Sequence, residues 1–280
     1  MTPTTVAARA GLQRGWIEYR QIVTNAGELL GWLWPTGVAL VVMYVLRGTV
    51  VPGTGFSLGA HAVPGILGMH VVFTAMMGLA VTLTMERDDG TLLRMKAVPN
   101  GMLGYLTGKV VSQATMTIAT VAAVLAPAAL LFDGLGLGGT ALPTLAWVLA
   151  LGLAATLPLG AVVGSLFRNP GSLGLVTLLI MGLVGISGVF YPITALPGWL
   201  QPIGQAFPVY WLGLGLRSGL LPDALAVAEV GGSWRHVETA VALGAWAVAG
   251  FVVAPVVLRR MARRVTGAGV RAGRQAGDTR

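Results

Sequence analysis

The sequence predicts an all-α integral membrane protein with six transmembrane helices. Charged residues make up 10% of the 280 residues and hydrophobic residues 55%, and the mean hydropathy is +0.78. Soluble domains carry about 25% charged residues, so a soluble fold of this length would lack the polar surface that it needs. Six apolar stretches also have the length for a membrane crossing, which takes roughly 20 residues. Composition and stretch length together exclude a large soluble globule.

Residues 1–28 are predicted to form a cytoplasmic amphipathic helix in the membrane interface. Apolar side chains recur at helical spacing and polar ones fall on the opposite face, as in helices that lie in the plane of the interface. The apolar set is Leu12, Trp16, Tyr19, Val23 and Ala26, and the polar set is Arg14, Glu18, Gln21, Asn25 and Glu28. A helix packed on a partner protein is the alternative, and the two are compatible.

Residues 29–260 are predicted to form the transmembrane domain. Prolines inside its apolar stretches are tolerated where neighbouring helices satisfy the freed carbonyl groups. The six predicted spans are 29–46, 62–85, 110–132, 142–167, 171–190 and 239–258.

The segment 190–221 is apolar and aromatic, but prolines break it too often for a continuous spanning helix. These are Pro192, Pro197, Pro202 and Pro208, with Pro222 just beyond. Irregular backbone at membrane depth persists only where it is packed in protein or lines a cavity. We therefore expect short re-entrant helices on the extracellular side.

The distribution of basic residues predicts which side faces the cytoplasm. With six spans, all but three of the 18 basic residues lie on the side of the two termini, and the exceptions are Arg47, Arg217 and Arg235. Cytoplasmic loops are enriched in Lys and Arg, so both termini and the basic tail 261–280 are expected in the cytoplasm. The net charge of +8 thus reflects topology and contact with anionic lipids, and no nucleic acid is expected as a partner. The glycines of the tail predict disorder after its first turn.

Several kinds of chemistry are missing from the chain. Around Gly108 and Lys109, the positions that a phosphate-binding loop fills with Gly and Ser or Thr hold Leu103 and Val110. No acidic residue lies at the centre of a span, which disfavours coupling to protons or sodium ions. With no cysteine and three scattered histidines, no metal site is expected. An active transporter of this sequence would need its energy from another subunit.

The polar stretch "MERDDGTLLRMKAVPN", residues 85–100, lies between two predicted spans. Its "ERDDG" is expected to end the second span, with Gly90 in a left-handed conformation, and "TLLRMKAV" is expected to form a short helix that Pro99 stops. Such a helix could dock in a groove of another protein. A solvated connector is the alternative reading of the residues alone.

This stretch resembles the loop of ABC-2-type transporter permeases, in which E-R-[DE]-x-G-[TS]-L precedes a proline and a "GK" that opens the third span. The segment "FYPITALPGWLQPIGQAFPVYWLGLGLRSGLL" is similar to the proline-rich extracellular segment of the same family. Length and the absence of large extra domains most resemble the drug-export, daunorubicin-resistance-like subgroup.

The resemblance implies a permease of a bacterial inner-membrane exporter for efflux of drugs or lipid-like compounds. It would pair with two copies of an ABC ATPase subunit, which would bind ATP and Mg²⁺, and with a second permease copy, either identical or a paralogue. This chain itself would be neither an enzyme nor a cofactor-binding protein. The loop 86–109 would hold the coupling helix, and its expected coupling residues are Glu86, Arg87, Asp88, Gly90, Thr91, Leu92, Arg94, Lys96 and Pro99.

The resemblance also implies that spans one, two and five line the substrate path and the dimer seam. The expected pathway residues are His70, Thr74, Met77 and Phe190, and the expected seam residues are Gly182, Gly185 and Gly188. Methionine-rich surfaces adapt to varied apolar ligands, although such methionines more often fill core gaps. For Gly160 and Gly164 we expect packing within one protomer.

Three other functions remain open from the sequence. They are a passive pore or lipid scramblase that needs no ATPase, an enzyme acting on lipid-linked substrates, and a regulatory membrane anchor. The enzyme is disfavoured because clustered carboxylates, histidines and lysines are missing at the membrane face.

Overall fold

The computed structural model describes residues 3–50, 55–167 and 170–277, and these are very largely helical. Five helical stretches are long and apolar enough to cross a bilayer: Ala26–Gly48, Leu58–Arg87, Gly101–Leu131, Ala141–Leu166 and His236–Leu258. The protein is therefore an all-α integral membrane protein. Helix α8 (Pro170–Ile186) has 17 residues, the lower limit of about 17 for a crossing. Predicted span five, 171–190, and with it the total of six spans, therefore stays a prediction.

The stretch Leu58–Arg87 is the central element of the fold. It consists of α3 (Leu58–Val71), a π-helical turn over Val72–Met77 and α4 (Gly78–Asp88). Of its 18 most apolar consecutive residues, 83% are buried, whereas only 11% are buried in the stretch that contains α2 (Ala26–Val45). A helix that is apolar all round is expected inside a bundle, whereas α2 presents most of its surface to lipid or to another chain.

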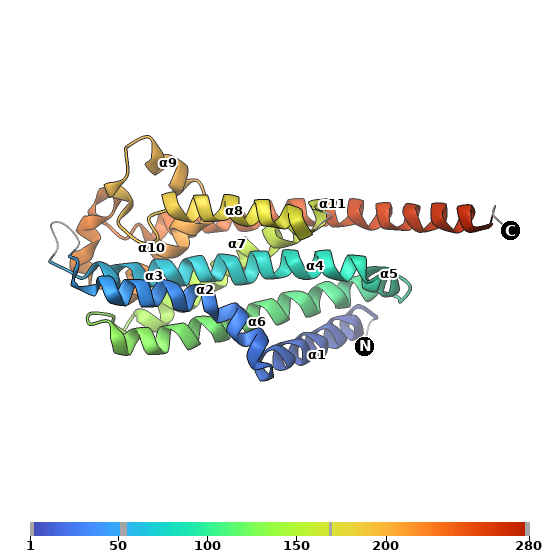
Figure 1. The fold of residues 1–280 in the computed structure, drawn as a ribbon, viewed down its shortest axis with the longest axis horizontal. Coiled ribbons are helices and arrows are strands. Elements are labelled where there is room, and N and C mark those ends of the chain that lie inside the picture. Colours follow the sequence, from blue (N-terminus) through green and yellow to red (C-terminus); the bar gives the residue numbers. More distant parts are fainter. Residues whose placement is uncertain (1–2, 51–54, 168–169, 278–280) are drawn as a thin grey trace.

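Helices α6 (Gly101–Leu131) and α7 (Ala141–Leu166) pack against the central element, and α11 (His236–Gly277) packs along α7 (Figure 1). Helix α7 approaches it through two glycines. A Cβ on Gly160 would lie 2.4 Å from the carbonyl oxygen of Met76, and one on Gly164 would lie 2.7 Å from that of Ala80. The predicted packing of these glycines within one protomer is confirmed.

Helix α1 (Pro3–Thr24) packs along α6, a contact that the sequence analysis missed. Its Gly11 and Gly15 face Gly104 and Gly108 of α6 so closely that a Cβ on either α1 glycine would lie within 2.5 Å of a carbonyl oxygen of α6. Both pairs have the G-x-x-x-G spacing of close helix contacts in membranes. The apolar face of α1 stays open, with Trp16 56% exposed, as a helix in the membrane interface requires.

The segment after α8 forms short helices, as its prolines predict. They are a 3₁₀ turn over Ile193–Ala195, α9 (Leu200–Gln205) and α10 (Pro208–Leu220). This segment lies at one end of the molecule, while both termini and α5 (Thr91–Lys96) lie toward the other end (Figure 1). Which of these two ends faces the cytoplasm stays a prediction from the distribution of basic residues.

Helix α11 extends to Gly277, beyond the point where disorder was expected. The glycines of the tail were the basis for that expectation, since each costs about 1 kcal/mol relative to alanine in a helix. The side chains beyond Met261 lie outside the described part of the structure.

Candidate functional site

Helix α5 is held at the end of α4 by a tight turn and one buried side chain. Gly90 joins the two helices with φ of 72°, the left-handed conformation expected from the sequence. Leu92 is 3% exposed and belongs to the same apolar cluster as Tyr105 of α6 and Met261 of α11. The outer side of the turn is open, because Arg94 and Pro99 are exposed. The short helix therefore has one anchored face and one accessible face.

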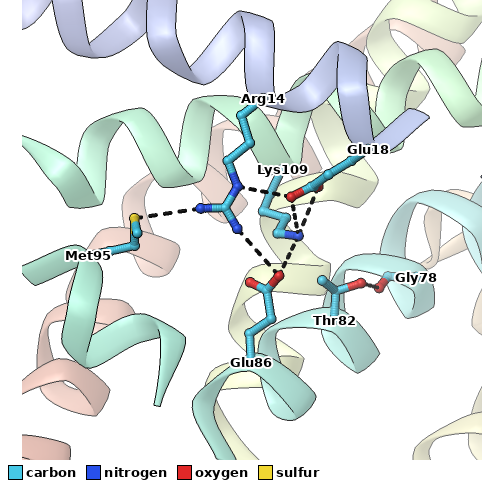
Figure 2. Close-up of polar contacts among 7 residues, drawn as sticks. All are labelled: Arg14, Glu18, Gly78, Thr82, Glu86, Met95 and Lys109. Atoms are coloured by element: carbon cyan, nitrogen blue, oxygen red, sulfur yellow. Dashed lines mark hydrogen bonds and ion pairs between the residues drawn. The ribbon is translucent and has the colours of Figure 1, made fainter. Parts of the chain in front are cut away.

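Four charged side chains form a network just before α5 (Figure 2). Lys109 Nζ donates to both carboxylate oxygens of Glu18 at 2.9 Å and lies 2.7 Å from Glu86 Oε1. Arg14 Nε donates to Glu18 Oε1 at 3.0 Å, and its Nη2 lies 3.7 Å from Glu86 Oε1. Two cations and two anions from α1, α4 and α6 balance one another, which lets Lys109 be only 6% exposed.

Two neighbouring side chains extend the network. Arg14 Nη1 donates to Met95 Sδ at 3.6 Å, which joins α1 directly to α5 (Figure 2). The guanidinium of Arg14 and the ammonium of Lys109 lie 5.3 and 5.9 Å from the ring centre of the buried Tyr105, within the range of cation–π attraction. Helices α1, α4, α5 and α6 therefore meet at one electrostatic junction.

Arg87 connects the same end of α4 to α7. Its Nη2 donates to the carbonyl oxygens of Gly164 and Phe167 at 2.8 and 2.6 Å. These carbonyls belong to the last turn of α7 and its C-cap, which lack partners within the helix, and a cation is favoured there. Arg87 thus fixes the end of α7 to the base of α5.

The structure separates the expected coupling residues into two groups. Glu86 and Arg87 contact other helices of this chain, whereas Arg94 and Pro99 face outward, and Gly90 and Thr91 are partly exposed. The side chains of Asp88 and Lys96 lie outside the described part of the structure. The sequence analysis missed the partners Arg14, Glu18 and Lys109. A lysine near the start of an apolar stretch was the available signal, since such a charge needs a partner.

A pocket lies between α2, the π-helical turn and α8, the elements that contain predicted spans one, two and five. It encloses about 330 Å³, and three of the four expected pathway residues line it. Phe190 is not among them. The lining residues are Gly31, Trp32, Pro35, Thr36, Met69, His70, Phe73, Thr74, Met77, Gly78, Val81, Thr177 and Met181. The set includes the aromatic rings of Trp32 and Phe73 and the thioethers of three methionines, and π-helical turns occur often at functional sites.

His70 connects three helices at the inner wall of this pocket. Its Nδ1 is 2.6 Å from Thr36 Oγ1 of α2, and its Nε2 is 2.7 Å from Thr120 Oγ1 of α6. Thr74 Oγ1 lies 3.2 Å from the same Nε2. Both ring nitrogens therefore have hydrogen-bond partners, so the imidazole fixes the helices and adds a polar spot to an apolar pocket.

The three glycines expected at a dimer seam differ in their surroundings. A Cβ on Gly182 or Gly185 would meet no atom within 4 Å among the described residues, so this face of α8 is open. Gly188 instead forms a turn with φ of 62°, and its carbonyl oxygen accepts a hydrogen bond from Arg217. Gly188 has a role inside the protomer, and Gly182 and Gly185 remain predictions for the seam.

A second buried charge cluster lies at the opposite end of the molecule. Arg217 of α10, which is fully buried, pairs with Glu229 at 2.9 Å. His61 Nε2 of α3 lies 3.8 Å from the same carboxylate. Burial, with the nearby Glu229 charge as a lesser cause, raises the pKa of Tyr210 to about 12, so its hydroxyl is neutral at physiological pH. Arg217 therefore holds α10, the Gly188 turn and the loop before α11 together.

Comparisons with known proteins identify a family and a relative. A family model described as "ABC-2 family transporter protein" matches residues 53–255, well over half of the chain. The chain is also 23% identical over 163 residues to "Putative transport permease YvfS" of Bacillus subtilis (strain 168). That match covers 56% of this chain and 63% of the relative, so it spans somewhat less than two thirds of the relative's length.

Proposed function

Since the chain belongs to the ABC-2 family of transporter proteins and is a membrane transporter subunit, we propose that it is the permease of an ATP-driven exporter. A separate ABC ATPase subunit, the usual partner of permeases of this family, would bind ATP and Mg²⁺. The complex would contain two such subunits and a second permease copy. It would move an apolar or amphiphilic compound out of the cell across the bacterial inner membrane.

The observation that carries this proposal is the two-faced attachment of α5. Its inner face is fixed by Leu92 and by the Arg14–Met95 contact, while Arg94 is exposed and Val98 is 54% exposed. A short helix with one anchored face and one open face suits docking in a groove of another protein. The position of α5 at the end that holds both termini (Figure 1) agrees with a cytoplasmic partner.

The ion network and Arg87 give a displacement of α5 a direct route into the bundle. Glu86 is one turn before Gly90, so a movement of α5 pulls on Lys109 of α6 and, through it, on Glu18 of α1. Arg87 conveys the same movement to the end of α7. Charge-assisted hydrogen bonds are about twice as strong as neutral ones, which suits them to move helices together.

The pocket at His70 supports the proposed substrate class. Trp32, Phe73, Met77 and Met181 make an apolar wall, and flexible thioethers adapt to ligands of different shape. His70 and Thr74, which hydrogen-bond to each other and to neighbouring helices, add one polar place to this wall. This mixture fits an amphiphilic compound with a large apolar body and one polar group, as in a drug or a lipid-like molecule.

The coupling role is tested by replacing Glu86 with Gln in the transporter reconstituted with its ATPase subunit. The variant keeps the shape of the side chain but removes the charge that Lys109 and Arg14 contact. We expect the ATPase to bind and hydrolyse ATP, while the amount of substrate moved per ATP falls about tenfold, the effect of losing roughly 1.4 kcal/mol of coupling. The measurement compares substrate efflux and phosphate release in the same vesicles.

Glu28→Gln is the matched control. Glu28 is an exposed carboxylate at the start of α2, outside the network, and its replacement should leave the transport-to-hydrolysis ratio unchanged. An unchanged ratio in Glu86→Gln would contradict the coupling role. Substrate movement without nucleotide or ATPase subunit would instead favour the passive pore or scramblase.

A further inference from the structure

A second groove lies near the end of α11 that is opposite the C-terminus, between α11 and the segment joining α9 to α10. It encloses about 410 Å³. Its lining residues are Gln205, Ala206, Trp211, Ala242, Ala245, Trp246 and Ala249. None of these residues belongs to the pocket at His70, so this groove is a separate feature.

The groove has an apolar floor and apolar walls. Ala242, Ala245 and Ala249 follow one another at helical spacing on one side of α11, and their short side chains leave the space open. The two indole N–H groups are already used, because Trp211 donates to the carbonyl oxygen of Gln205 at 2.6 Å and Trp246 to that of Ala206 at 3.0 Å. Their rings therefore present carbon surface to the groove.

The position of the groove along α11 places it within the membrane. At 1.5 Å per residue, Ala242 lies about 9 Å and Ala249 about 20 Å from His236, where the apolar helix begins. The hydrocarbon core is about 30 Å thick, so the groove begins inside the leaflet that contains His236 and reaches the middle of the bilayer. On the same helix Val241 and Val248 are 66% and 65% exposed, as side chains that contact lipid are. The groove therefore faces the acyl chains of the surrounding lipids.

A cation lies at the groove's end that is nearest to the membrane surface. The guanidinium carbon of Arg235 is 4.9 Å from the ring centre of Trp211, and Nη1 donates to Gln205 Oε1 at 2.8 Å. Arg235 has φ of 48°, a conformation that a residue other than glycine adopts only where its surroundings enforce it. Its carboxylate neighbour Glu238 is 3.6 Å away and half exposed, and Tyr210 also interacts with Arg235, so a closer anion would compete only with the distant Glu238 carboxylate for the positive charge.

From these observations we propose that the groove binds one glycerophospholipid, with an acyl chain along Ala242, Ala245 and Ala249 and its phosphate on Arg235. Arginine matches the geometry of phosphate oxygens, and the alanines extend from Arg235 toward the middle of the bilayer, as an acyl chain does from its headgroup. The bound lipid would cover the contact between α10 and α11 and so stabilise the packing of the segment 190–221 on α11. This inference does not depend on the ATPase partner or on the transported substrate.

The test uses the full-length protein in detergent, titrated with palmitoyl-oleoyl-phosphatidylglycerol and followed by native mass spectrometry. We expect one lipid to bind more tightly than the rest. Ala245→Trp, which fills the groove from an exposed position, should raise the Kd of that lipid about tenfold or more. Arg235→Gln should raise it about tenfold, the loss expected for one charge-assisted hydrogen bond. A diacylglycerol with the same chains but no phosphate should bind the wild type as weakly as phosphatidylglycerol binds Arg235→Gln.

Val248→Trp is the matched control, since Val248 is exposed on α11 outside the groove. Its Kd for the first lipid should stay within about twofold of the wild type, as exposed positions away from a site have small effects. Equal weakening by Ala245→Trp and Val248→Trp would overturn the groove as the site. An unchanged Kd in Arg235→Gln, or equal binding of diacylglycerol and phosphatidylglycerol, would overturn the phosphate contact.

Discussion

At the scale of single residues, buried charges hold this protein together at both ends of its helices. At the α5 end, Lys109 joins Glu18 and Glu86, and at the other end Arg217 joins Glu229. An unpaired charge in such places is costly, whereas a paired one roughly offsets its own desolvation. We infer that these residues specify which segments meet, more than they raise the total stability.

This view predicts an asymmetry between single and double replacements at Arg217. Arg217→Met should lower the free energy of unfolding by about 3–5 kcal/mol, because Glu229 is left buried without its cation. Adding Glu229→Leu should restore part of that loss, since no charge then remains buried. Thermal unfolding of the purified variants in detergent measures both effects. A double variant that is no more stable than Arg217→Met would show that the loss has another cause than the unpaired carboxylate.

At the scale of elements, periodicity and proline content predicted most helices, and contacts between distant segments account for what was missed. The length of the apolar stretches predicted where the spans lie, and the prolines at 192, 197 and 208 predicted the breaks between the short helices of the segment 190–221. The π-helical turn over Val72–Met77 has no local signal, because it depends on packing around the central helix. The docking of α1 on α6 had a signal in two G-x-x-x-G sequences, but that pattern is common in a chain with 41 glycines.

The candidate site was predictable only in part, for the same reason. The sequence located α5 and the turn at Gly90, because caps and breaks are local. It assigned Glu86 and Arg87 to a docking partner, whereas in the structure both side chains contact other helices of the same chain. The ion pairs that join different helices in the network are 23 to 91 positions apart in the sequence, as Glu86–Lys109 and Glu18–Lys109 show, and periodicity contains no information about such pairs.

The contact between α1 and α6 gives an element-scale prediction. Gly15→Leu should separate the two helices, because even a Cβ there would lie 2.5 Å from the carbonyl oxygen of Gly108. Overpacking of this kind costs about 1–3 kcal/mol, and α1 should become sensitive to protease in detergent. Gly182→Leu is the control, since a Cβ at that position meets open space. Equal protease resistance of α1 in Gly15→Leu and in the wild type would contradict the tight contact.

At the scale of the whole molecule, one buried helix connects the two ends. Near its start, His61 lies beside the Arg217–Glu229 pair, and farther along, the stretch Leu58–Arg87 lines the pocket at His70. It ends at Glu86 and Arg87, and α5 follows it directly, as the ribbon shows (Figure 1). Packed helices transmit displacement because close-packed interiors do not compress. A force on α5 would therefore reach the pocket through the π-helical turn, where the helix is least regular.

The most direct test of this account asks which surface contacts the ATPase subunit. The chain has no cysteine, so Arg94→Cys places a single thiol on the open face of α5, and Trp199→Cys places one on an exposed residue of the opposite end. A short thiol-to-amine cross-linker is added to membranes that contain the ATPase subunit co-expressed with either variant. The account predicts a cross-linked permease–ATPase band with Arg94→Cys and none with Trp199→Cys. A band with Trp199→Cys, or an ATPase that purifies with the permease but never cross-links to Arg94→Cys, would contradict it.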